Sequence, residues 1–322
     1  MKRIFLMLLC LFILTGCQPK ETVIQGFSMD TSYQIKVENL SDEQETKLKS
    51  YLHKIDTIMD AYREDSLISE LNKTKTLTVS DKDDQILFEL IHKTLPHCNS
   101  AFDISIRPVS KLWDFKTDTP FLPDETVLLN HLQSVGYQNI IVSNNTIQLK
   151  NDAEIELGAV AKGYVCDQLA EMLSEQIALI DIGGTVQSIG KDSTVGVKSP
   201  DYDGLLCSFT LPDGKSVSTS GSYERNFSLD NQFYHHILDP KTGYPVETDL
   251  ISVTVICDSA LKADILSTTL FAENSFRIPE SAEVIYVTKE NLVYVSEGVE
   301  NFKLLNTTYQ EAELTEECFY DV

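Results

Sequence analysis

The sequence predicts an α+β protein in which mixed sheets pack against helices. Three observations predict this class. The chain has 322 residues, of which 42% are hydrophobic and 23% charged, so it can bury a sizeable core and is neither disordered nor a coiled coil. Helical and strand-like patterns alternate along it without the strict strand–helix–strand order of a parallel sheet. No internal repeat, low-complexity tract or interdomain linker interrupts the pattern.

The N-terminus has the pattern of a targeting signal. Lys2 and Arg3 precede an apolar run of 11 residues, 4–14, which is shorter than the about 20 residues of a membrane-spanning helix. The run ends in Leu-Thr-Gly-Cys17, which resembles the lipobox of bacterial lipoproteins. We therefore expect a signal peptide over 1–16, and a lipid on Cys17 that anchors the chain to a membrane of the bacterial envelope, outside the cytoplasm. Residues 17–25 would form the tether. An ordinary signal peptide with a stray cysteine is the alternative.

The first half of the mature chain is predicted to be mostly helical. Residues 42–59 carry apolar side chains at Leu48, Leu52, Ile55 and Met59, which is a helical spacing. The other predicted elements are a strand over 32–37, helices over 65–71, 83–95 and 124–134, and a hairpin of 140–142 with 147–149.

The second half is predicted to be richer in strands. Its predicted elements are a helix over 162–173, a strand over 178–182, a glycine pair at 183–184, short strands between 195 and 238, a strand over 251–257, a helix over 259–272 and a hairpin of 284–287 with 292–295. The acidic end, 311–322, is expected to be a solvated tail.

Charge and cysteine usage exclude several functions. The net charge is −23, which repels phosphate backbones, so we expect no nucleic-acid partner. An anionic ligand would need backbone N–H groups, a helix N-terminus or a divalent cation to offset that repulsion. Beyond Cys10 in the signal and Cys17, five widely spaced cysteines remain, without CxxC or zinc-site spacing. We expect most of them to be buried, with at most a disulfide or two.

The common nucleotide and hydrolase motifs are missing. Gly158 and Gly163 have the spacing of a P-loop, but Tyr164 follows where Lys should stand. The chain also has no GxSxG elbow and no GxGxxG after a strand. Kinase, nucleotide-hydrolase and serine-hydrolase activities therefore lose their main support.

Three segments are rich in functional residue types. Residues 157–164, LGAVAKGY, place small residues at a helix start, where a phosphate could approach the backbone; tight helix–sheet packing is the alternative. The second segment is 218–225, STSGSYER, followed by 234–245, which hold His235 and His236 beside a DPKTG turn. The histidines could be a base, metal ligands or structural residues. Since neighbours on a strand face opposite ways, only one of them can point into a given pocket.

The third segment is the predicted helix 259–272. Asp264, Ser267 and Thr268 lie at i, i+3 and i+4, so one carboxylate and two hydroxyls share a helix face. An all-oxygen set of this kind suits Mg²⁺, which keeps waters and borrows ligands from phosphates. A plain polar face near a helix N-terminus is the alternative.

Together these segments resemble the ApbE family, the FAD:protein FMN transferases, from Gly26 to about Tyr294. Eight ordered motifs carry the likeness. They are SMDT at 28–31, MDAYREDS at 59–66, AFDIS at 101–105, LGAVAKGY at 157–164, IGG at 182–184, SG at 220–221, HILDP with TG at 236–243, and AD with Thr268 at 263–268. The chain departs from the family at Asp30, where Gly is usual, and at Ser105-Ile106-Arg107, where Thr-Val-Gly is usual. We expect Arg107 to alter contacts to the phosphates or to a neighbouring loop.

The resemblance implies an ApbE-like, T-fold-related domain over 26–310, with FAD in a cleft between two subdomains. It implies that FMN is transferred from FAD to a Thr or Ser hydroxyl of an acceptor protein with an FMN-binding domain, with release of AMP. Such acceptors are subunits of membrane redox complexes or secreted flavoproteins. The implied FAD-lining residues are Met29, Tyr62, Ala101, Phe102, Asp103, Gly158, Tyr164 and Leu238. The implied Mg²⁺ ligands are Ala161, through its carbonyl, Asp264, Ser267 and Thr268.

His236 is the implied base, and Asp239 could orient its ring. A neutral imidazole suits this role because its ordinary pKa lies near neutrality. Two other functions stay open. An FAD pyrophosphatase would use the same metal and let water attack, and a lipid-anchored flavin-binding protein would need no base at all.

Overall fold

A computed structural model describes residues 20–113, 115 and 120–314 of the chain. The expected signal peptide and Cys17 lie outside these residues, as do Cys318 and the end of the acidic tail. Within the described part, no helix combines the length and apolarity needed to cross a membrane.

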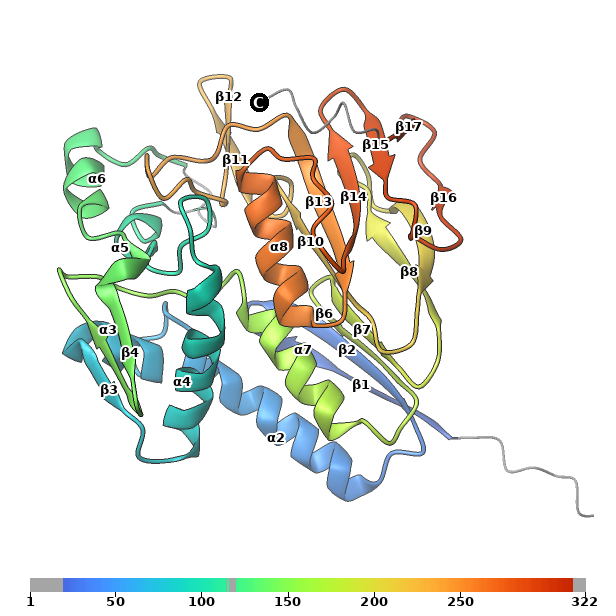
Figure 1. Ribbon diagram of the computed structural model, residues 1–322, viewed down its shortest axis with the longest axis horizontal. Coiled ribbons are helices and arrows are strands. Elements are labelled where there is room, and N and C mark those ends of the chain that lie inside the picture. The colour runs from blue at the N-terminus through green and yellow to red at the C-terminus, as the bar shows by residue number, and fades with distance from the viewer. Residues whose placement is uncertain (1–19, 114, 116–119, 315–322) are drawn as a thin grey trace, which may run out of the picture.

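A large sheet of nine strands organises the molecule (Figure 1). Neighbouring strands run antiparallel, except that β17 pairs parallel with β15. Its strands, in spatial order, are β1 (Glu21–Ser28), β2 (Thr31–Glu38), β6 (Ala178–Ile182), β7 (Thr185–Ile189), β10 (Ser216–Gly221), β13 (Leu250–Cys257), β14 (Glu283–Thr288), β15 (Leu292–Val295) and β17 (Gln310–Glu313).

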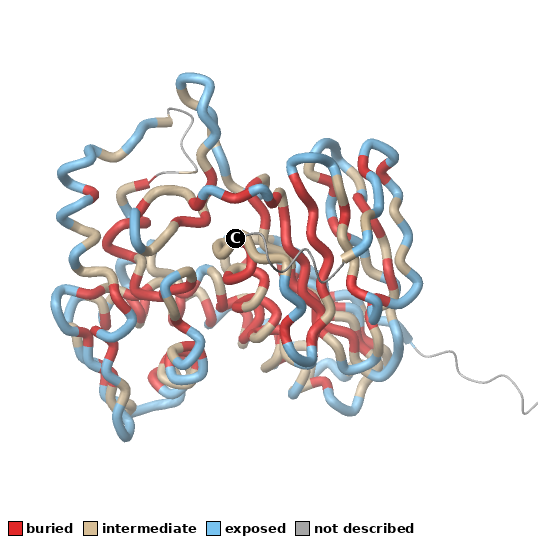
Figure 2. The backbone as a smooth tube through the Cα atoms, turned by 45° about the horizontal axis from the view of Figure 1, so that its top comes forward, coloured by how far each residue is buried: buried red, intermediate tan, exposed pale blue. Residues whose placement is uncertain are grey.

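Three helices lie along one face of this sheet: α2 (Asp42–Met59), α7 (Ala161–Met172) and α8 (Ala260–Ala272). A small sheet of β16 (Lys303–Leu304), β9 (Leu205–Leu211) and β8 (Ser193–Lys198) contributes to a separate apolar core with strands β10, β13, β14 and β15. Helix α8 is buried on most sides, in keeping with its long apolar stretches. The central strands β10, β13 and β14 of the large sheet are largely buried, whereas the edge strands β1 and β17 and the outer loops are mostly exposed (Figure 2).

A second group of elements, mostly helical, stands beside the first half of the sheet. It holds α3 (Leu67–Thr74), α4 (Lys82–Thr94), α5 (Arg107–Ser110), α6 (Glu125–Leu132), the short helices η2 (Leu95–His97) and η3 (Tyr137–Asn139), and the sheet β3 (Thr76–Thr78), β5 (Thr146–Leu149), β4 (Ile140–Ser143). A continuous apolar core joins α2, α4 and α7 to strands β1, β2 and β6.

Most predicted elements are confirmed, although the helix predicted over 65–71 lies at Leu67–Thr74 and the one predicted over 124–134 at Glu125–Leu132, and the tether and the tail were wrong. Helix α2 has the predicted bounds, and Ser41 caps it in a capping box with Gln44. The tether was predicted too long, because residues 21–25 already belong to β1, whose Ile24 is buried against the core. The tail was also wrong at its start, because β17 pairs with β15. Strands β11 (Asn226–Leu229) and β12 (Gln232–His235) form a separate hairpin.

The cysteine prediction is confirmed for the described residues. Cys98, Cys166, Cys207 and Cys257 are buried and none forms a disulfide. Burial raises the pKa of each of these thiols, so they act as small apolar side chains.

Candidate active site

The crossing of α7 and α8 is set by Gly163. A Cβ at this position would lie 2.3 Å from the carbonyl oxygen of Ala260, so no other residue allows the two helices to approach so closely. One turn further, Asp167 accepts hydrogen bonds from the Ser259 hydroxyl at 2.7 Å and from the Ala260 N–H at 2.7 Å. The first turns of both helices are therefore fixed against each other.

Asp264 projects from α8 into this crossing and is only 2% exposed. Its Oδ2 accepts a hydrogen bond from the Gly163 N–H at 2.7 Å, and its Oδ1 accepts one from the Thr185 hydroxyl at 2.9 Å and another from Ser218. The Lys162 Nζ lies 3.9 Å from Oδ2. A buried carboxylate is thus surrounded by donors from α7, β7 and β10.

Hydroxyl groups continue this polar pocket along α8. The Ser220 Oγ on β10 lies 2.9 Å from the Ser267 Oγ and 3.0 Å from the Thr268 Oγ1. Ala161, the fourth predicted metal ligand, begins α7, two residues before Gly163. The structure therefore brings Asp264, Ser267 and Thr268 together, and places Ala161 at the start of the helix that contacts Asp264.

The donor set of this pocket fits a hard cation. It consists of one carboxylate and several hydroxyls, all of which are oxygen ligands. Within the described ranges, no group of three His, Cys, Asp or Glu side chains is arranged to hold a metal. A cation at Asp264 would therefore depend on hydroxyl, carbonyl, water and substrate oxygens, as Mg²⁺ commonly does.

The two adjacent histidines have different environments. His235 is buried, and both of its nitrogens are used: Nε2 lies 3.2 Å from the Val246 carbonyl oxygen, and Nδ1 accepts from the Ile237 N–H at 3.3 Å. Its ring packs edge-on against Phe271. His235 is therefore structural, which decides between the two histidines in favour of His236.

His236 is half-buried, and its Nδ1 lies 3.3 Å from the carbonyl oxygen of Arg225. A carbonyl can only accept, so this contact favours the tautomer with hydrogen on Nδ1 and leaves the lone pair on Nε2. Burial lowers the pKa of His236 to about 3, and the positive charges of Arg225 and Lys162 act in the same direction. The ring is thus neutral at pH 7.

Asp239 does not orient the His236 ring, which was its possible role in the sequence analysis. Its Oδ1 accepts a hydrogen bond from the Lys241 N–H at 2.8 Å, inside the DPKTG turn. The Arg225 carbonyl, and not Asp239, is the partner of the His236 ring. The turn is fixed from outside by Trp113, whose indole N–H donates to the Gly243 carbonyl at 2.9 Å.

The predicted FAD-lining residues fall into two groups. Tyr62 and Gly158 are exposed, and Met29 and Ala101 are half-buried, so these four are accessible to a ligand. The buried members are Phe102, Asp103, Tyr164 and Leu238.

Asp103 and Tyr164 have structural partners. The Oδ1 of Asp103 accepts from the Ser105 hydroxyl at 2.7 Å, and its Oδ2 accepts from the Tyr137 N–H at 2.8 Å. The Tyr164 hydroxyl lies 3.5 Å from Glu89 on α4, and burial raises its pKa. Asp103 therefore ties Ser105 to Tyr137, and Tyr164 contacts α4 from α7.

Sequence reasoning singled out the segment 218–225 but gave no role to its individual residues, and it did not consider Thr185. Thr185 and Ser218 donate to Asp264, Ser220 contacts Ser267, and the Arg225 carbonyl contacts the His236 ring. A signal for two of them was present, because Ser218 and Ser220 alternate on one face of β10. Nothing in the pattern of the chain shows that this face meets α8.

A separate cavity of about 580 Å³ opens at the ends of β1, β2 and β6. It is lined by Tyr33, Asp181 and the Gly183–Gly184 pair, among others, and by none of the predicted site residues. Its one carboxylate and lack of a cation make it a poor place for a pyrophosphate.

Comparison with known proteins agrees with this geometry. The ApbE family model matches residues 29–286. The chain belongs to the ApbE family. It is 36% identical over 232 residues to an FAD:protein FMN transferase of Klebsiella pneumoniae (strain 342), covering 67% of this chain and 73% of that protein. It is 28% identical to an FAD:protein FMN transferase of Escherichia coli (strain K12), covering 84% and 82%.

Solved structures confirm the ApbE-like α+β fold. The crystal structure of the ApbE protein from Thermotoga maritima superposes with a TM-score of 0.76 at 26% identity, over 86% of this chain and 97% of that one. The flavin transferase ApbE from Vibrio cholerae gives a TM-score of 0.72 at 24% identity, over 87% and 98%. The fold of this ApbE-family chain is thus shared over nearly the full length of both proteins.

Proposed function

We propose that this chain is an FAD:protein FMN transferase, which moves FMN from FAD to a Thr or Ser hydroxyl of an acceptor protein and releases AMP. The observation that carries the proposal is the pairing of a neutral His236, with its Nε2 lone pair available, with the oxygen-rich pocket of Asp264. Lys162 links the two, because its charge acts on His236 and its Nζ lies 3.9 Å from Asp264.

The chemistry follows from these groups. The acceptor hydroxyl oxygen attacks the phosphorus of the FMN half of FAD, the bond to the AMP half breaks, and His236 Nε2 accepts the hydroxyl proton. Lys162, whose Nζ lies 3.9 Å from Asp264, would place a positive charge near the pyrophosphate, whereas Arg225 is already in an ion pair with Asp30 at 2.7 Å. When bound at Ala161, Asp264, Ser267 and Thr268, Mg²⁺ would neutralise further phosphate charge and polarise the phosphorus. The protein must also hold the acceptor hydroxyl and the FAD phosphorus in the geometry of attack.

Binding of FAD is assigned to the predicted lining residues. The accessible ones, Met29, Tyr62, Ala101 and Gly158, would contact the dinucleotide directly. Phe102, Asp103, Tyr164 and Leu238 would form the walls behind them. The acceptor would be a protein with an FMN-binding domain, such as a membrane redox subunit or a secreted flavoprotein. A lipid on Cys17 would keep the enzyme at the outer face of a bacterial membrane, beside such acceptors.

The test uses the chain from Gln18 with FAD and Mg²⁺, with and without an FMN-domain acceptor. Products are followed by chromatography and intact mass. We expect the acceptor to gain one FMN mass, with AMP released only when the acceptor is present. AMP and free FMN without acceptor would instead identify an FAD pyrophosphatase, and intact FAD with measurable binding would identify a flavin-binding protein.

A further inference from the structure

Asp30 departs from the family motif, and the chemistry described so far gives it no role. It stands where Gly is usual, in the two-residue turn between β1 and β2 that the Ser28–Thr31 pair closes. Met29 and Asp30 have φ angles of 52° and 59°, so both lie in the left-handed region. Gly adopts this region most readily, whereas a residue with a Cβ is strained there. The backbone of the turn therefore does not explain an aspartate, and its side chain has to.

The side chain of Asp30 holds Arg225, which lies 195 residues further along the chain. Nη2 of Arg225 donates to Oδ2 of Asp30 at 2.7 Å, and the two side chains are 41% and 45% exposed. Strands β6 and β7 lie between β2 and β10 in the sheet, so the pair joins segments that are not neighbours in it. Because both side chains are accessible, a ligand can reach the guanidinium and replace the carboxylate.

Arg225 also lies beside the candidate base. Its carbonyl oxygen lies 3.3 Å from His236 Nδ1 and accepts the His236 N–H at 3.1 Å. Burial lowers the pKa of His236 to about 3, and the charge of Arg225 is the next contribution, so the guanidinium is within electrostatic reach of the ring. If His236 accepts the proton of the attacking hydroxyl, the phosphorus under attack lies close to this ring. The ion pair is therefore near the place where the pyrophosphate would bind.

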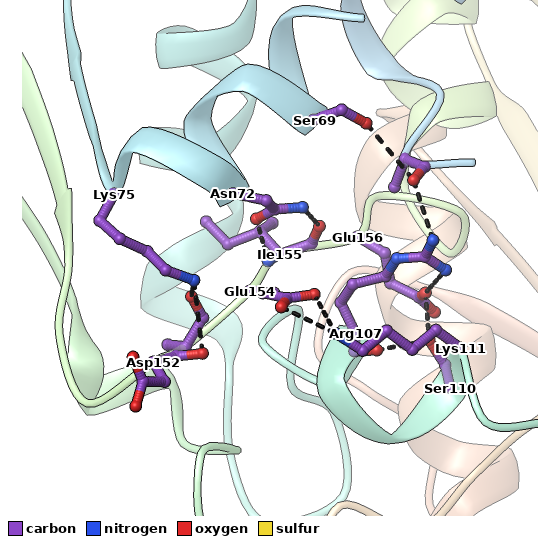
Figure 3. A network of polar contacts seen from close by, with 12 residues as sticks. Ser69, Asn72, Lys75, Arg107, Ser110, Lys111, Asp152, Glu154, Ile155 and Glu156 are labelled. Atoms are coloured by element: carbon purple, nitrogen blue, oxygen red, sulfur yellow. Dashed lines mark hydrogen bonds and ion pairs between the residues drawn. The ribbon is translucent and has the colours of Figure 1, made fainter. Parts of the chain in front are cut away.

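Glu156 is a second carboxylate within electrostatic reach of Arg225, but it is already engaged. Burial raises the pKa of Glu156, and Arg225 is among the groups that lower it. Its Oε2 accepts a hydrogen bond from Ser110 and lies 3.8 Å from Arg107 Nη1 (Figure 3). A guanidinium binds two phosphate oxygens through parallel N–H groups. An Arg225 side chain released from Asp30 would thus find a better partner in a phosphate than in Glu156.

We propose that Asp30 competes with the phosphates of FAD for the guanidinium of Arg225, and so lowers the affinity of this chain for FAD. The proposal rests on the transferase function, because that function places the pyrophosphate beside His236. Without FAD, Arg225 is paired with Asp30. When FAD binds, the guanidinium moves from the carboxylate to a phosphate oxygen. Binding therefore breaks one ion pair, in a chain whose net charge of −23 already opposes an anion.

The experiment measures the Kd of FAD by flavin fluorescence at a fixed Mg²⁺ concentration. Asp30→Asn keeps the size of the side chain and tolerates the left-handed region, but it removes the charge. It should lower Kd about threefold to fivefold, the range expected when an exposed ion pair no longer competes. Asp30→Gly should do the same, because it also lacks the carboxylate. Riboflavin, which has no phosphate, should bind to the wild type and to Asp30→Asn equally.

A double-mutant cycle separates competition from simple repulsion between Asp30 and the phosphates. Arg225→Gln should weaken FAD binding, because it removes the group that both anions seek. In the Arg225→Gln background, Asp30→Asn should leave Kd nearly unchanged, because no guanidinium remains to compete for. Repulsion would instead persist or grow in that background, since the Asp30 carboxylate would then have lost its cation.

Glu38→Gln is the matched control. Glu38 ends strand β2, which begins directly after Asp30, and it pairs with Lys191 at the same distance of 2.7 Å. The substitution changes the net charge equally. The eight residues of β2 separate the two sites by about 25 Å, well beyond the Debye length of about 10 Å at 0.1 M salt. Its Kd should be that of the wild type, and thermal melting of every variant checks that it is folded.

Four results would overturn the proposal: an unchanged Kd in Asp30→Asn, an equal tightening of riboflavin binding, tightening that persists in the Arg225→Gln background, or tightening by Glu38→Gln. Tightening by Asp30→Gly alone would trace the effect to the backbone of the turn and would overturn it too. Failure of the transferase function is distinct, because it is seen as absent flavinylation of the acceptor by the wild type. The Kd values for FAD still decide the role of Asp30 in that case.

Discussion

His236 and His235 are neighbours with different expected roles, and activity and stability should depend on pH differently through each of them. For His236, the pKa is lowered to about 3, and the base must be unprotonated to accept a proton. Transfer should therefore show no loss between pH 7 and 5, where an ordinary histidine with a pKa of about 6.5 would lose most of its activity. His236→Ala should lower kcat at least about a hundredfold and leave FAD binding nearly intact. Activity that falls with a midpoint near pH 6.5 would contradict this environment, and flavinylation retained in His236→Ala would remove the base assignment.

His235 should affect stability and not chemistry. Burial lowers its pKa to about 4 from the ordinary 6.5. Between these values the unfolded chain binds a proton that the folded chain does not, so stability falls as pH drops from 6.5 to 4, by about 3 kcal/mol in total for this group. His235→Gln keeps a donor for the Val246 carbonyl but does not titrate. Urea unfolding at pH 7 and pH 4.5 should therefore show a smaller acid loss in the variant.

Other buried groups act in the opposite direction in that experiment. Burial raises the pKa of the carboxyls of Asp103, Asp167, Asp181 and Glu156, and a raised carboxyl pKa favours the folded state as pH falls. They are present in both proteins, so they cancel in the difference between wild type and variant. An equal acid loss in both would show that His235 is already protonated in the folded protein.

Single side chains were predictable from the sequence where their chemistry is local. The i, i+3, i+4 spacing of Asp264, Ser267 and Thr268 is a property of any helix, and their proximity is confirmed. The choice between His235 and His236 was not predictable, because it depends on the Val246 and Arg225 carbonyls, which are brought to the rings by tertiary packing. Arg107 was predicted to alter phosphate contacts or a neighbouring loop, and its contacts are with the loop.

The two glycines of the LGAVAKGY segment should respond differently to substitution. At Gly163 an added methyl meets the Ala260 carbonyl oxygen at 2.3 Å, so α7 and α8 must separate. We expect Gly163→Ala to cost about 3 kcal/mol of unfolding free energy and to abolish transfer, because the Gly163 N–H leaves Asp264. At Gly158 the methyl meets nothing within 4 Å, so stability should stay within about 0.5 kcal/mol. Chemical denaturation of both variants measures this.

Gly158→Ala also distinguishes the two interpretations of this segment, which are approach of a phosphate to the backbone and tight packing of the helix. If a ligand approaches the backbone at Gly158, the variant should bind FAD more weakly while unfolding like the wild type. Unchanged FAD affinity would leave these glycines with packing roles alone, and Gly163 already has one. Equal stability losses in the two variants would show that the helix crossing is not as close as described.

Helices and strands were predictable where apolar residues recur at the spacing of one buried face. They were not predictable at the edges of the large sheet, where few residues are buried. The four apolar positions of α2 all face the core, so its bounds follow from the sequence. Strand β1 was taken for tether because only Ile24 and Ser28 of its eight residues are buried. Strand β17 has no fully buried residue and owes its conformation to pairing with β15. Edge strands are defined by their partners, which the local pattern does not contain.

The acidity of the chain as a whole makes substrate binding depend on added positive charge. A net charge of −23 opposes the approach of a pyrophosphate, and the two cations that act on His236 already face carboxylates, Lys162 at 3.9 Å from Asp264 and Arg225 at 2.7 Å from Asp30. FAD alone should therefore raise the melting temperature little, whereas FAD with Mg²⁺ should raise it by several degrees, in line with about 2.7 kcal/mol at a hundred times Kd. Mg²⁺ without FAD should have a smaller effect, because the protein offers one carboxylate.

Thr268→Val tests whether that dependence arises at Asp264. The substitution keeps the shape of the side chain and removes a hydroxyl that is half-exposed and 3.0 Å from Ser220. We expect the Mg²⁺ concentration for half-maximal stabilisation with FAD to rise about tenfold, the order found when a ligand or its support is lost at a metal site. Thr269→Val is the control, because the buried Thr269 hydroxyl donates to the Ile265 carbonyl at 2.7 Å, away from the pocket. An equal Mg²⁺ dependence in wild type and Thr268→Val would place the cation elsewhere, and the charge of the pyrophosphate would then have to be balanced by the protein's own cations.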